Sequence, residues 1–249
     1  MDRILASWEI LVQKIDILRT TFHFSADLGV WVQAVHRIYA LAYTRESVDN
    51  PKELQAAVKD FFASYVPSTT DAFREPPLRV RVFSSGENTR HLAFLLHHSL
   101  YDGVSIPILL QAVEAIYHGK ASEHYPQYHQ LLPHIIGQEE RGAVFWLQKL
   151  RGLRSNRLLQ TKTPSRQRVF FQEIKVAFTD DAISRFLSHG TTMQCLGQAA
   201  WSKTLAKLTS SPDVIFGHTV SGRSIPDADE VIGPVLVCNF SPQYGIATE

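Results

Sequence analysis

The sequence predicts a mixed α/β fold in which helices and strands follow one another along the chain. Apolar residues recur at helical spacing near the start, whereas later runs alternate or are continuously apolar, as in strands. The 249 residues include 45% hydrophobic and 20% charged residues, a composition typical of a globular protein. At roughly 100–200 residues per domain, this length allows one large domain or two small ones.

Composition and charge exclude several classes of protein. The net charge of +1 gives no electrostatic footprint for nucleic acid or for a membrane surface. No stretch approaches the roughly 18 uncharged apolar residues that a membrane span needs, and the N-terminus shows no clean apolar signal region. The two cysteines, Cys195 and Cys238, form neither a disulfide framework nor a four-thiolate zinc site. We therefore expect a cytoplasmic protein.

The first half of the chain predicts two helices, two hairpins and a third helix. Apolar spacing predicts a helix over residues 3–16, and Asn50-Pro51 predicts the cap and first turn of a second helix. A turn at Asp27-Leu28-Gly29 joins two β-rich runs. The strands expected here are 18–24, 30–38, 78–83 and 91–98. The last is nearly continuously apolar, which predicts a central strand covered on both faces. A helix should follow Asp102-Gly103.

The second half predicts a linker and a smaller unit. Helices are expected over 129–137 and 140–150. The basic, polar stretch that follows is the best linker in the chain. The division expected is residues 1–152, a linker over 153–166, and a second unit over 167–249. Its expected elements are strands 168–178, 214–220 and 235–240 and helices 180–188 and 191–208.

The sharpest local feature is His97-His98-Ser99-Leu100-Tyr101-Asp102-Gly103, where a buried strand gives way to a helix. Adjacent strand residues point to opposite faces, so only one histidine can face a given cleft. A neutral imidazole there can accept a proton. The N–H of Gly103, at a helix N-terminus, favours developing negative charge. The alternatives are a satisfied core histidine and an ordinary Asp-Gly turn. A metal site is not expected.

This segment resembles the HHxxxDG signature of nonribosomal peptide synthetase condensation domains, within the chloramphenicol acetyltransferase-like superfamily. Other segments agree in the same order. They are Leu18-Arg19-Thr20-Thr21-Phe22 (LRTxF), Phe145-Trp146 with Leu150 and Gly152 (YWxxxLxG), Val214 to Arg223 (VxFGxxxSGR), and Ile232-Gly233-Pro234 with Asn239 (IGPxxN). The second-lobe segments are most similar to fungal synthetases, with siderophore-making ones as candidates.

The resemblance implies a two-lobe chloramphenicol acetyltransferase-like fold, an α+β sandwich, and amide-bond formation between thioesters on carrier proteins. The partners implied are peptidyl or aryl carrier domains, which bring phosphopantetheine arms, with an adenylation domain as a further candidate. No directly bound cofactor is implied. The catalytic residues implied are His98 and Gly103.

The resemblance also implies supporting residues around the cleft. His97 supports the catalytic histidine. Asp102 is structural and pairs with an arginine, for which Arg19 is the candidate. Ser221 and Asn239 lie on segments that bridge or floor the cleft, with a polar turn or strand end as the alternative for each. Arg223 is equally interpretable as a solvated charge at a strand end.

The chain departs from the family pattern at several points. Lys14-Ile15 stands where the family usually has Arg-His, and Asn239 is not followed by threonine. We expect truncation at both ends, with the first lobe nearly complete and the second partial. Two alternative functions therefore stay open. One is an inactive fragment that binds carrier proteins as a scaffold. The other is an acyl-CoA-dependent acyltransferase, although the DFGWG segment of such enzymes is missing.

Overall fold

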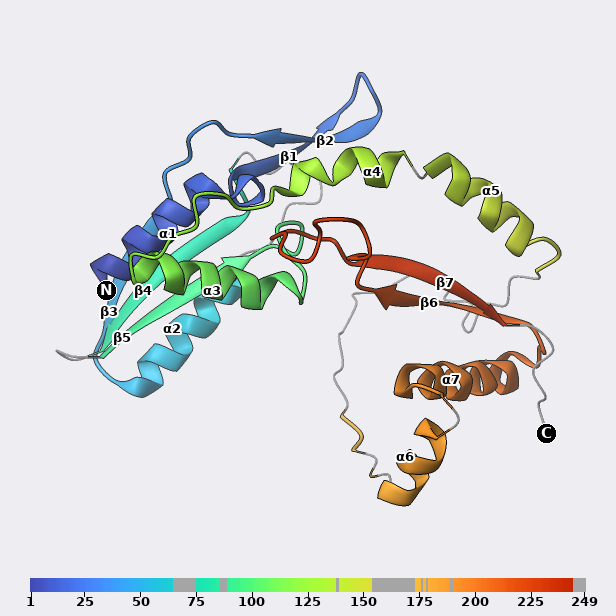
Figure 1. The fold of residues 1–249 in the computed structure, drawn as a ribbon. Helices are drawn as coiled ribbons and strands as arrows, with labels where there is room; N and C mark the ends of the chain where they lie inside the picture. Colours follow the sequence, from blue (N-terminus) through green and yellow to red (C-terminus); the bar gives the residue numbers. More distant parts are fainter. Residues whose placement is uncertain are drawn as a thin grey trace. The chain divides into compact units, whose positions relative to one another are not determined.

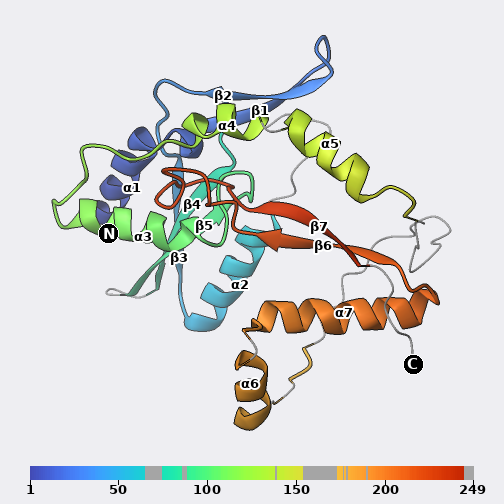
Figure 2. The same cartoon turned by 45° about the vertical axis from the view of Figure 1, so that its right-hand side comes forward.

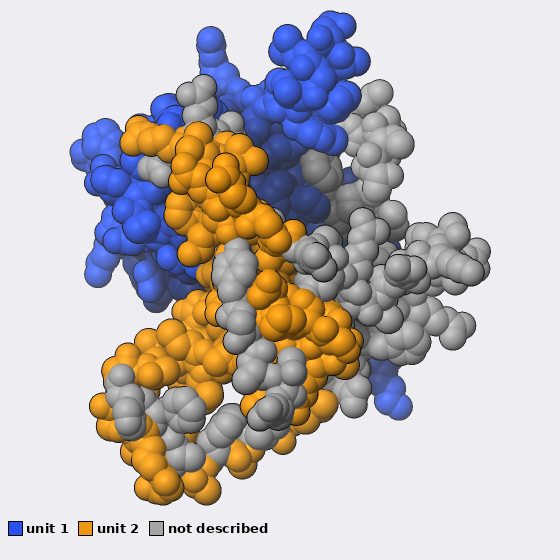
Figure 3. Space-filling view, turned by 90° about the vertical axis from the view of Figure 1, so that its right-hand side faces the viewer, with its two compact units in different colours: residues 1–139, 220–237 blue, residues 140–219, 238–249 orange. Residues whose placement is uncertain are grey.

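The structure is a computed structural model that describes residues 1–64, 75–85, 89–137, 139–153, 173–175, 177, 179–188 and 190–243. The chain forms two compact units, coloured separately in Figure 3: unit 1 is residues 1–139 with 220–237, and unit 2 is residues 140–219 with 238–249. The sequence-based division instead assigned 220–237 to the second lobe. The expected linker over 153–166 lies outside the described residues except for Leu153.

Unit 1 carries most of the helices and strands that the structure describes. They are α1 (Asp2–Lys14), η1 (Asp16–Arg19), β1 (Thr20–Ser25), β2 (Val30–Val35), β3 (Tyr43–Val48), α2 (Pro51–Ala63), β4 (Leu78–Ser85), β5 (Thr89–Leu96), α3 (Ser105–Tyr117), η2 (Tyr128–Gln130) and α4 (Leu132–Ile136). The predicted helices over 3–16, 50 onward and after Asp102-Gly103 are confirmed within a few residues.

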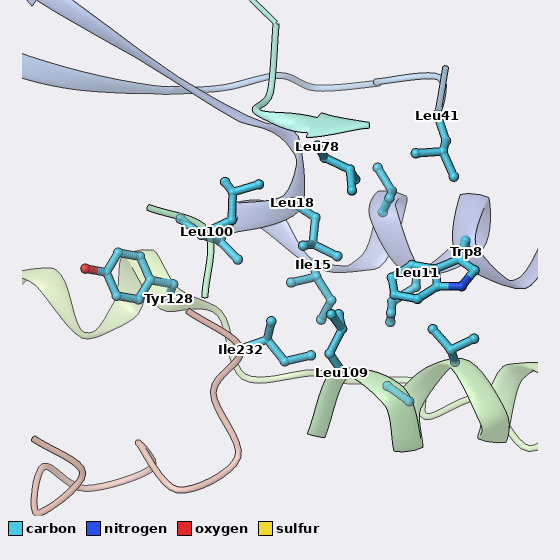
Figure 4. Packing of buried hydrophobic residues seen from close by; sticks show 14 of the residues in the cluster. Trp8, Leu11, Ile15, Leu18, Leu41, Leu78, Leu100, Leu109, Tyr128 and Ile232 are labelled. Carbon is cyan, nitrogen blue, oxygen red and sulfur yellow. The ribbon is translucent and has the colours of Figure 1, made fainter. Parts of the chain in front are cut away.

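A three-stranded sheet in the order β3-β4-β5 separates two helical layers of unit 1 (Figures 1 and 2). β3 pairs with β4 in parallel, and β4 pairs with β5 antiparallel. Side chains of β4 alternate between the faces: Val80 and Val82 join the large core with α1 and α3, whereas Phe83 packs with Phe61 of α2. Figure 4 shows the large core, in which Ile232 lies beside Leu109.

Strand β5 partly fits its prediction as a buried central strand. Ala93 and Leu95 pack in the cluster on the α2 side, while Leu92, Phe94 and Leu96 pack against the large core, so both faces are covered. The central position is wrong for the described residues, in which β5 pairs only with β4 and lies at the edge of the sheet. A continuously apolar sequence indicates that both faces of a strand are buried, but it does not show how many strands pair with it.

Strand β3 was not predicted from the sequence, because its residues show no strand-like alternation of apolar and polar side chains. Most of its residues are exposed. It is held by main-chain pairing in register with β4, from Tyr43 opposite Val80 to Val48 opposite Ser85. Arg81 of β4 adds an ion pair to Glu46 at 3.0 Å. Pairing of this kind joins segments about 35 residues apart, so a local pattern does not reveal it.

The hairpin predicted around Asp27-Leu28-Gly29 is confirmed as β1 and β2. The two strands pair antiparallel from Thr20 opposite Val35 to Ser25 opposite Val30. Gly29 adopts a φ of +66° in the turn, a conformation that glycine reaches without a steric penalty. Thr20 and Thr21 at the start of β1 are buried, whereas every residue of β2 is exposed.

Helix α2 begins as its first residues predict. The Asn50 side chain accepts hydrogen bonds from the N–H groups of Lys52 and Glu53, both at 3.1 Å, and Pro51 occupies the first turn. Replacing Asn50 with alanine removes the one oxygen that accepts both hydrogen bonds, so we expect the free energy of unfolding to fall by about 0.5–2 kcal/mol. Urea unfolding measures the change. Lys52→Ala is the control, because it keeps the main-chain donor and should leave the midpoint unchanged.

Unit 2 contains helices α5 (Glu139–Lys149), α6 (Asp180–Leu187) and α7 (Met193–Thr209) and most of the paired strands β6 (Val214–Val220) and β7 (Val237–Gln243). Its small core joins Leu205 and Ala206 to Val214. The strand expected over 168–178 lies largely outside the described residues; within it, 173–175 and 177 are neither helix nor strand. In the described part of the chain, no helix is long and apolar enough to cross a bilayer.

Candidate active site

The two histidines lie in the turn that follows β5, and their environments differ. The turn is anchored by a hydrogen bond from the Leu100 N–H to the His97 carbonyl at 2.9 Å, with the Leu100 side chain fully buried in the core. His97 is half-buried, whereas His98 is exposed to solvent. The exposed histidine, His98, is therefore the one to which the family resemblance gives the catalytic role.

His97 is held by its neighbour Ser99. The Ser99 N–H donates to His97 Nδ1 at 3.2 Å, and the Ser99 hydroxyl lies 3.0 Å from the same nitrogen. Because Nδ1 accepts a hydrogen bond, we assign the proton of the neutral ring to Nε2. Burial lowers the pKa of His97, and the nearby His98 lowers it further. A neutral, fixed His97 fits a supporting role.

The His98 ring stacks on Tyr101, with centroids 4.8 Å apart and planes inclined by 18°. This contact orients one face of the imidazole and leaves the rest of the ring in solvent. An imidazole placed in this way can accept or donate a proton. His98 therefore has the exposure that acid–base chemistry requires.

The Asp102 carboxylate is fully buried and receives hydrogen bonds on both oxygens. Oδ1 accepts from the N–H groups of Val104 at 3.1 Å and Ser105 at 2.7 Å, so Asp102 holds the turn that leads into α3. Oδ2 accepts from the N–H groups of Val235 at 3.0 Å and Leu236 at 3.1 Å. One side chain thus ties the histidine turn to a segment about 130 residues later in the chain.

Arg223 completes this network. Its guanidinium donates to both Asp102 oxygens, at 2.9 and 3.1 Å. Another nitrogen of the same group donates to the carbonyls of Ala228 and Val231, at 2.5 and 3.0 Å. The two side chains are 5% and 0% exposed, so water screens the pair very little. The pair explains why residues 220–237 belong to unit 1.

Burial alone raises the pKa of Asp102, but its surroundings reverse that effect. The hydrogen bonds from Ser105 and the charge and hydrogen bonds of Arg223 hold the pKa of the carboxyl below its usual range. Asp102 is therefore an anion at neutral pH, fixed in the interior, and it is not a proton donor or acceptor for catalysis.

The predicted pair between Arg19 and Asp102 is wrong. The Arg19 guanidinium instead donates to the Asp16 carboxylate and to the His36 carbonyl. Asp16 lies three residues before Arg19 in the same turn of helix, so the local partner is within easy reach. The interpretation of Arg223 as a solvated charge is also wrong. The arginine that meets Asp102 comes from a distant segment, which sequence spacing does not identify.

Gly103 is exposed, and its backbone does not require glycine. Its φ is not positive, and a Cβ built on it would meet no atom within 4 Å. Of the N–H groups from 102 to 105, those of Asp102, Val104 and Ser105 are donated within the turn. The Gly103 N–H has no acceptor among the described residues. This N–H is therefore a free donor on the same turn as His98.

The two remaining predicted site residues lie on later segments of the chain. Ser221 is exposed, and its hydroxyl accepts from the Arg223 N–H at 3.4 Å. Asn239 lies in β7 in unit 2, and its side chain is outside the described residues. No group of three or more metal-ligating side chains occurs among the residues that the structure describes.

Sequence reasoning gave no site role to Ser105, Gly233 and Tyr128, which complete the surroundings of Asp102. The fully buried Ser105 hydroxyl lies 3.1 Å from the Gly233 carbonyl. Gly233 approaches the Tyr128 ring so closely that an added Cβ would lie 2.6 Å from the ring carbon Cδ2. Two of them carried a sequence signal: Ser105 stands three residues after Asp102, a position that a capping side chain reaches, and Gly233 belongs to the IGPxxN segment.

Gly233→Ala should lower the free energy of unfolding by about 1–3 kcal/mol, because the new methyl group has to displace the Tyr128 ring or the backbone. Gly103→Ala is the matched control, since its methyl group meets open space, and its unfolding free energy should change by at most about 0.5–1 kcal/mol. Urea unfolding of the two variants tests the difference. Equal midpoints would contradict the close contact with Tyr128.

Comparison with known proteins identifies the class to which this fold and turn belong. The family model described as Condensation domain matches residues 1–238. The chain is 36% identical over 237 residues to Coprinoferrin synthetase of Coprinopsis cinerea, covering 95% of this chain and 9% of that protein. It is 31% identical over 242 residues to the Ferrichrome siderophore peptide synthetase of Mycosarcoma maydis, covering 94% of this chain and 6% of that protein.

A solved structure shares the fold. The condensation domain from Monacolin K polyketide synthase MokA superimposes with a TM-score of 0.74 at 20% identity, covering 99% of this chain and 60% of that one. The chain thus spans less than a tenth of the length of these two curated relatives and about three fifths of the solved domain. The chain belongs to the condensation-domain family, with the chloramphenicol acetyltransferase-like fold.

Proposed function

We propose that this chain contributes the histidine turn of a condensation domain that forms amide bonds between carrier-bound thioesters in nonribosomal peptide synthesis. The observation that carries the proposal is the exposed imidazole of His98 on a turn whose far end is fixed by the buried pair of Asp102 and Arg223. A rigid buried anchor beside an exposed titratable group is the arrangement expected of a preorganised site.

In the proposed reaction, the acceptor's α-amine attacks the carbonyl carbon of the donor thioester. A C–N bond forms, the C–S bond breaks, and the amine proton ends on the thiol of the donor phosphopantetheine. His98 accepts or orients that proton, because an α-amine has a pKa near 8, within reach of an imidazole. The Gly103 N–H donates to the oxyanion as it forms. His97, Asp102 and Arg223 position the turn.

The printed name of one relative supports the product class, and the family supports the partners. Because this chain is similar to the Ferrichrome siderophore peptide synthetase, we place it in siderophore peptide assembly. The partners are a donor and an acceptor carrier protein, each with its phosphopantetheine arm, and an adenylation domain loads them. Ser221 and Asn239 are proposed to line the substrate path. The location proposed is the cytoplasm, on the cysteine content alone.

The test is an assay for dipeptide formation with the full chain. Two carrier proteins are loaded, one with a donor aminoacyl thioester and one with an acceptor, and mass spectrometry follows the peptide on the acceptor. Product that depends on the chain supports the proposal. Carrier binding without product favours the scaffold alternative, and product with an acyl-CoA donor but not with a loaded carrier favours the acyl-CoA alternative. Either of these two outcomes would overturn the proposal.

A further inference from the structure

The Ser105 hydroxyl lies at the centre of the network around Asp102, although Ser105 is outside the HHxxxDG segment. It is fully buried at the first residue of α3. Its Oγ accepts from the Asp102 N–H at 2.8 Å and lies 2.7 Å from Asp102 Oδ1. The same oxygen lies 3.1 Å from the Gly233 carbonyl. It therefore contacts both segments that the Asp102 carboxylate joins.

These contacts decide which N–H group of the turn stays free. Ser105 takes up the N–H of Asp102 through its side chain and gives its own N–H to the Asp102 carboxylate. Val104 also donates to that carboxylate. The N–H groups of Asp102 and Val104, on either side of Gly103, are both hydrogen-bonded. The peptide plane that carries the Gly103 N–H therefore lies between two fixed peptide groups.

We infer that Ser105 is a positioning residue that fixes the Gly103 N–H in the orientation that leaves it free as a donor, and that links the histidine turn to the segment 231–236. Only the effect of this role on catalysis rests on the proposed function. Its structural part, the reciprocal Ser105–Asp102 hydrogen bonds, is independent of any reaction.

The first test reads the amides of the turn directly. Hydrogen exchange followed by NMR on the full chain should show slow exchange at Asp102 and fast exchange at Gly103. In Ser105→Ala the Asp102 N–H loses its acceptor, so its exchange should accelerate at least about tenfold while the amides within α1 keep their rates. Unchanged exchange at Asp102 in the variant, or slow exchange at Gly103 in the wild type, would overturn the inference whether or not the chain forms peptides.

The second test separates positioning from stability. With loaded carriers, Ser105→Ala should lower kcat by about tenfold to 100-fold with little change in KM, because misplacement of a donor affects the transition state more than the bound substrate. Ser105→Thr keeps the hydroxyl and should recover most of kcat. If Ser105→Thr does not fold, the exchange test on Ser105→Ala decides.

Ser7→Ala provides the matched control for both tests. Ser7 is a buried serine of α1, also in unit 1, and its hydroxyl donates to the Arg3 carbonyl at 2.8 Å. Its replacement removes the same group without touching the turn. It should change neither the exchange at Asp102 nor kcat. An equal loss of kcat in Ser7→Ala and Ser105→Ala would show that general destabilisation is the cause and would overturn the positioning role. A wild-type chain without activity would sink the proposed function and leave the exchange result standing.

Discussion

His98→Ala should reduce the rate of amide formation by about 10²–10⁴-fold, the range that a positioned acid–base group contributes. The ring is exposed and its described aromatic partner is Tyr101, so its removal should change the free energy of unfolding by no more than about 0.5 kcal/mol. The dipeptide assay gives the rate, and urea unfolding gives the stability. A large loss of rate at constant stability is the expected signature of a catalytic residue.

His118→Ala is the control for this variant. His118 is also an exposed histidine of unit 1 beside a tyrosine, with its ring 5.3 Å from that of Tyr117. It lies at the far end of α3 from the histidine turn. Its replacement should leave the rate within about twofold of the wild type, as expected of a residue that makes no contact with the reacting groups. Equal rates for wild type and His98→Ala would contradict the role of His98.

Arg223→Leu should lower the free energy of unfolding of unit 1 by about 3–5 kcal/mol. The reason is that the variant leaves the Asp102 carboxylate buried without its cation. It also removes the donors to the carbonyls of Ala228 and Val231. Urea unfolding followed at the NMR signal of the Trp8 indole reports on unit 1, since Trp8 is buried in its core. The double variant Arg223→Leu/Asp102→Asn should recover part of the loss, because no charge is then left unpaired.

Arg45→Leu is the matched control, because Arg45 pairs with Asp2 at 2.6 Å in the same unit but on the exposed surface. Its loss should leave the unfolding midpoint unchanged, as is usual for exposed ion pairs. A midpoint lowered equally by both variants would contradict the special role of burial.

The same pair predicts a dependence of stability on pH. The pKa of Asp102 is lower in the folded chain than the value of roughly 3.9 expected when unfolded. The unfolded state therefore binds the proton first, so the contribution of Asp102 is fully present above that value and is lost as the pH falls toward the folded pKa. The stability difference between wild type and Arg223→Leu should accordingly shrink at acidic pH. A difference that stays constant with pH would contradict an ionised Asp102.

Residues close together in the chain are enough to predict the features whose causes are local. Asn50 and Pro51 begin α2 because a side-chain acceptor and a fixed φ act within one turn. The hairpin at Gly29 and the helix after Asp102-Gly103 follow from residues only a few positions apart. The placement of His97, His98 and Gly103 together is likewise local, since they share one turn.

Which distant segments pack together is known only from the folded chain. Arg19 lies in a predicted strand and Arg223 follows another, and pairing with Asp102 depends on which of them the fold brings within 3 Å. Strand β3 exists because β4 supplies main-chain partners. Long-range contacts such as these depend on how the whole chain packs around its core. The sequence around each residue therefore does not identify the distant residue that it contacts.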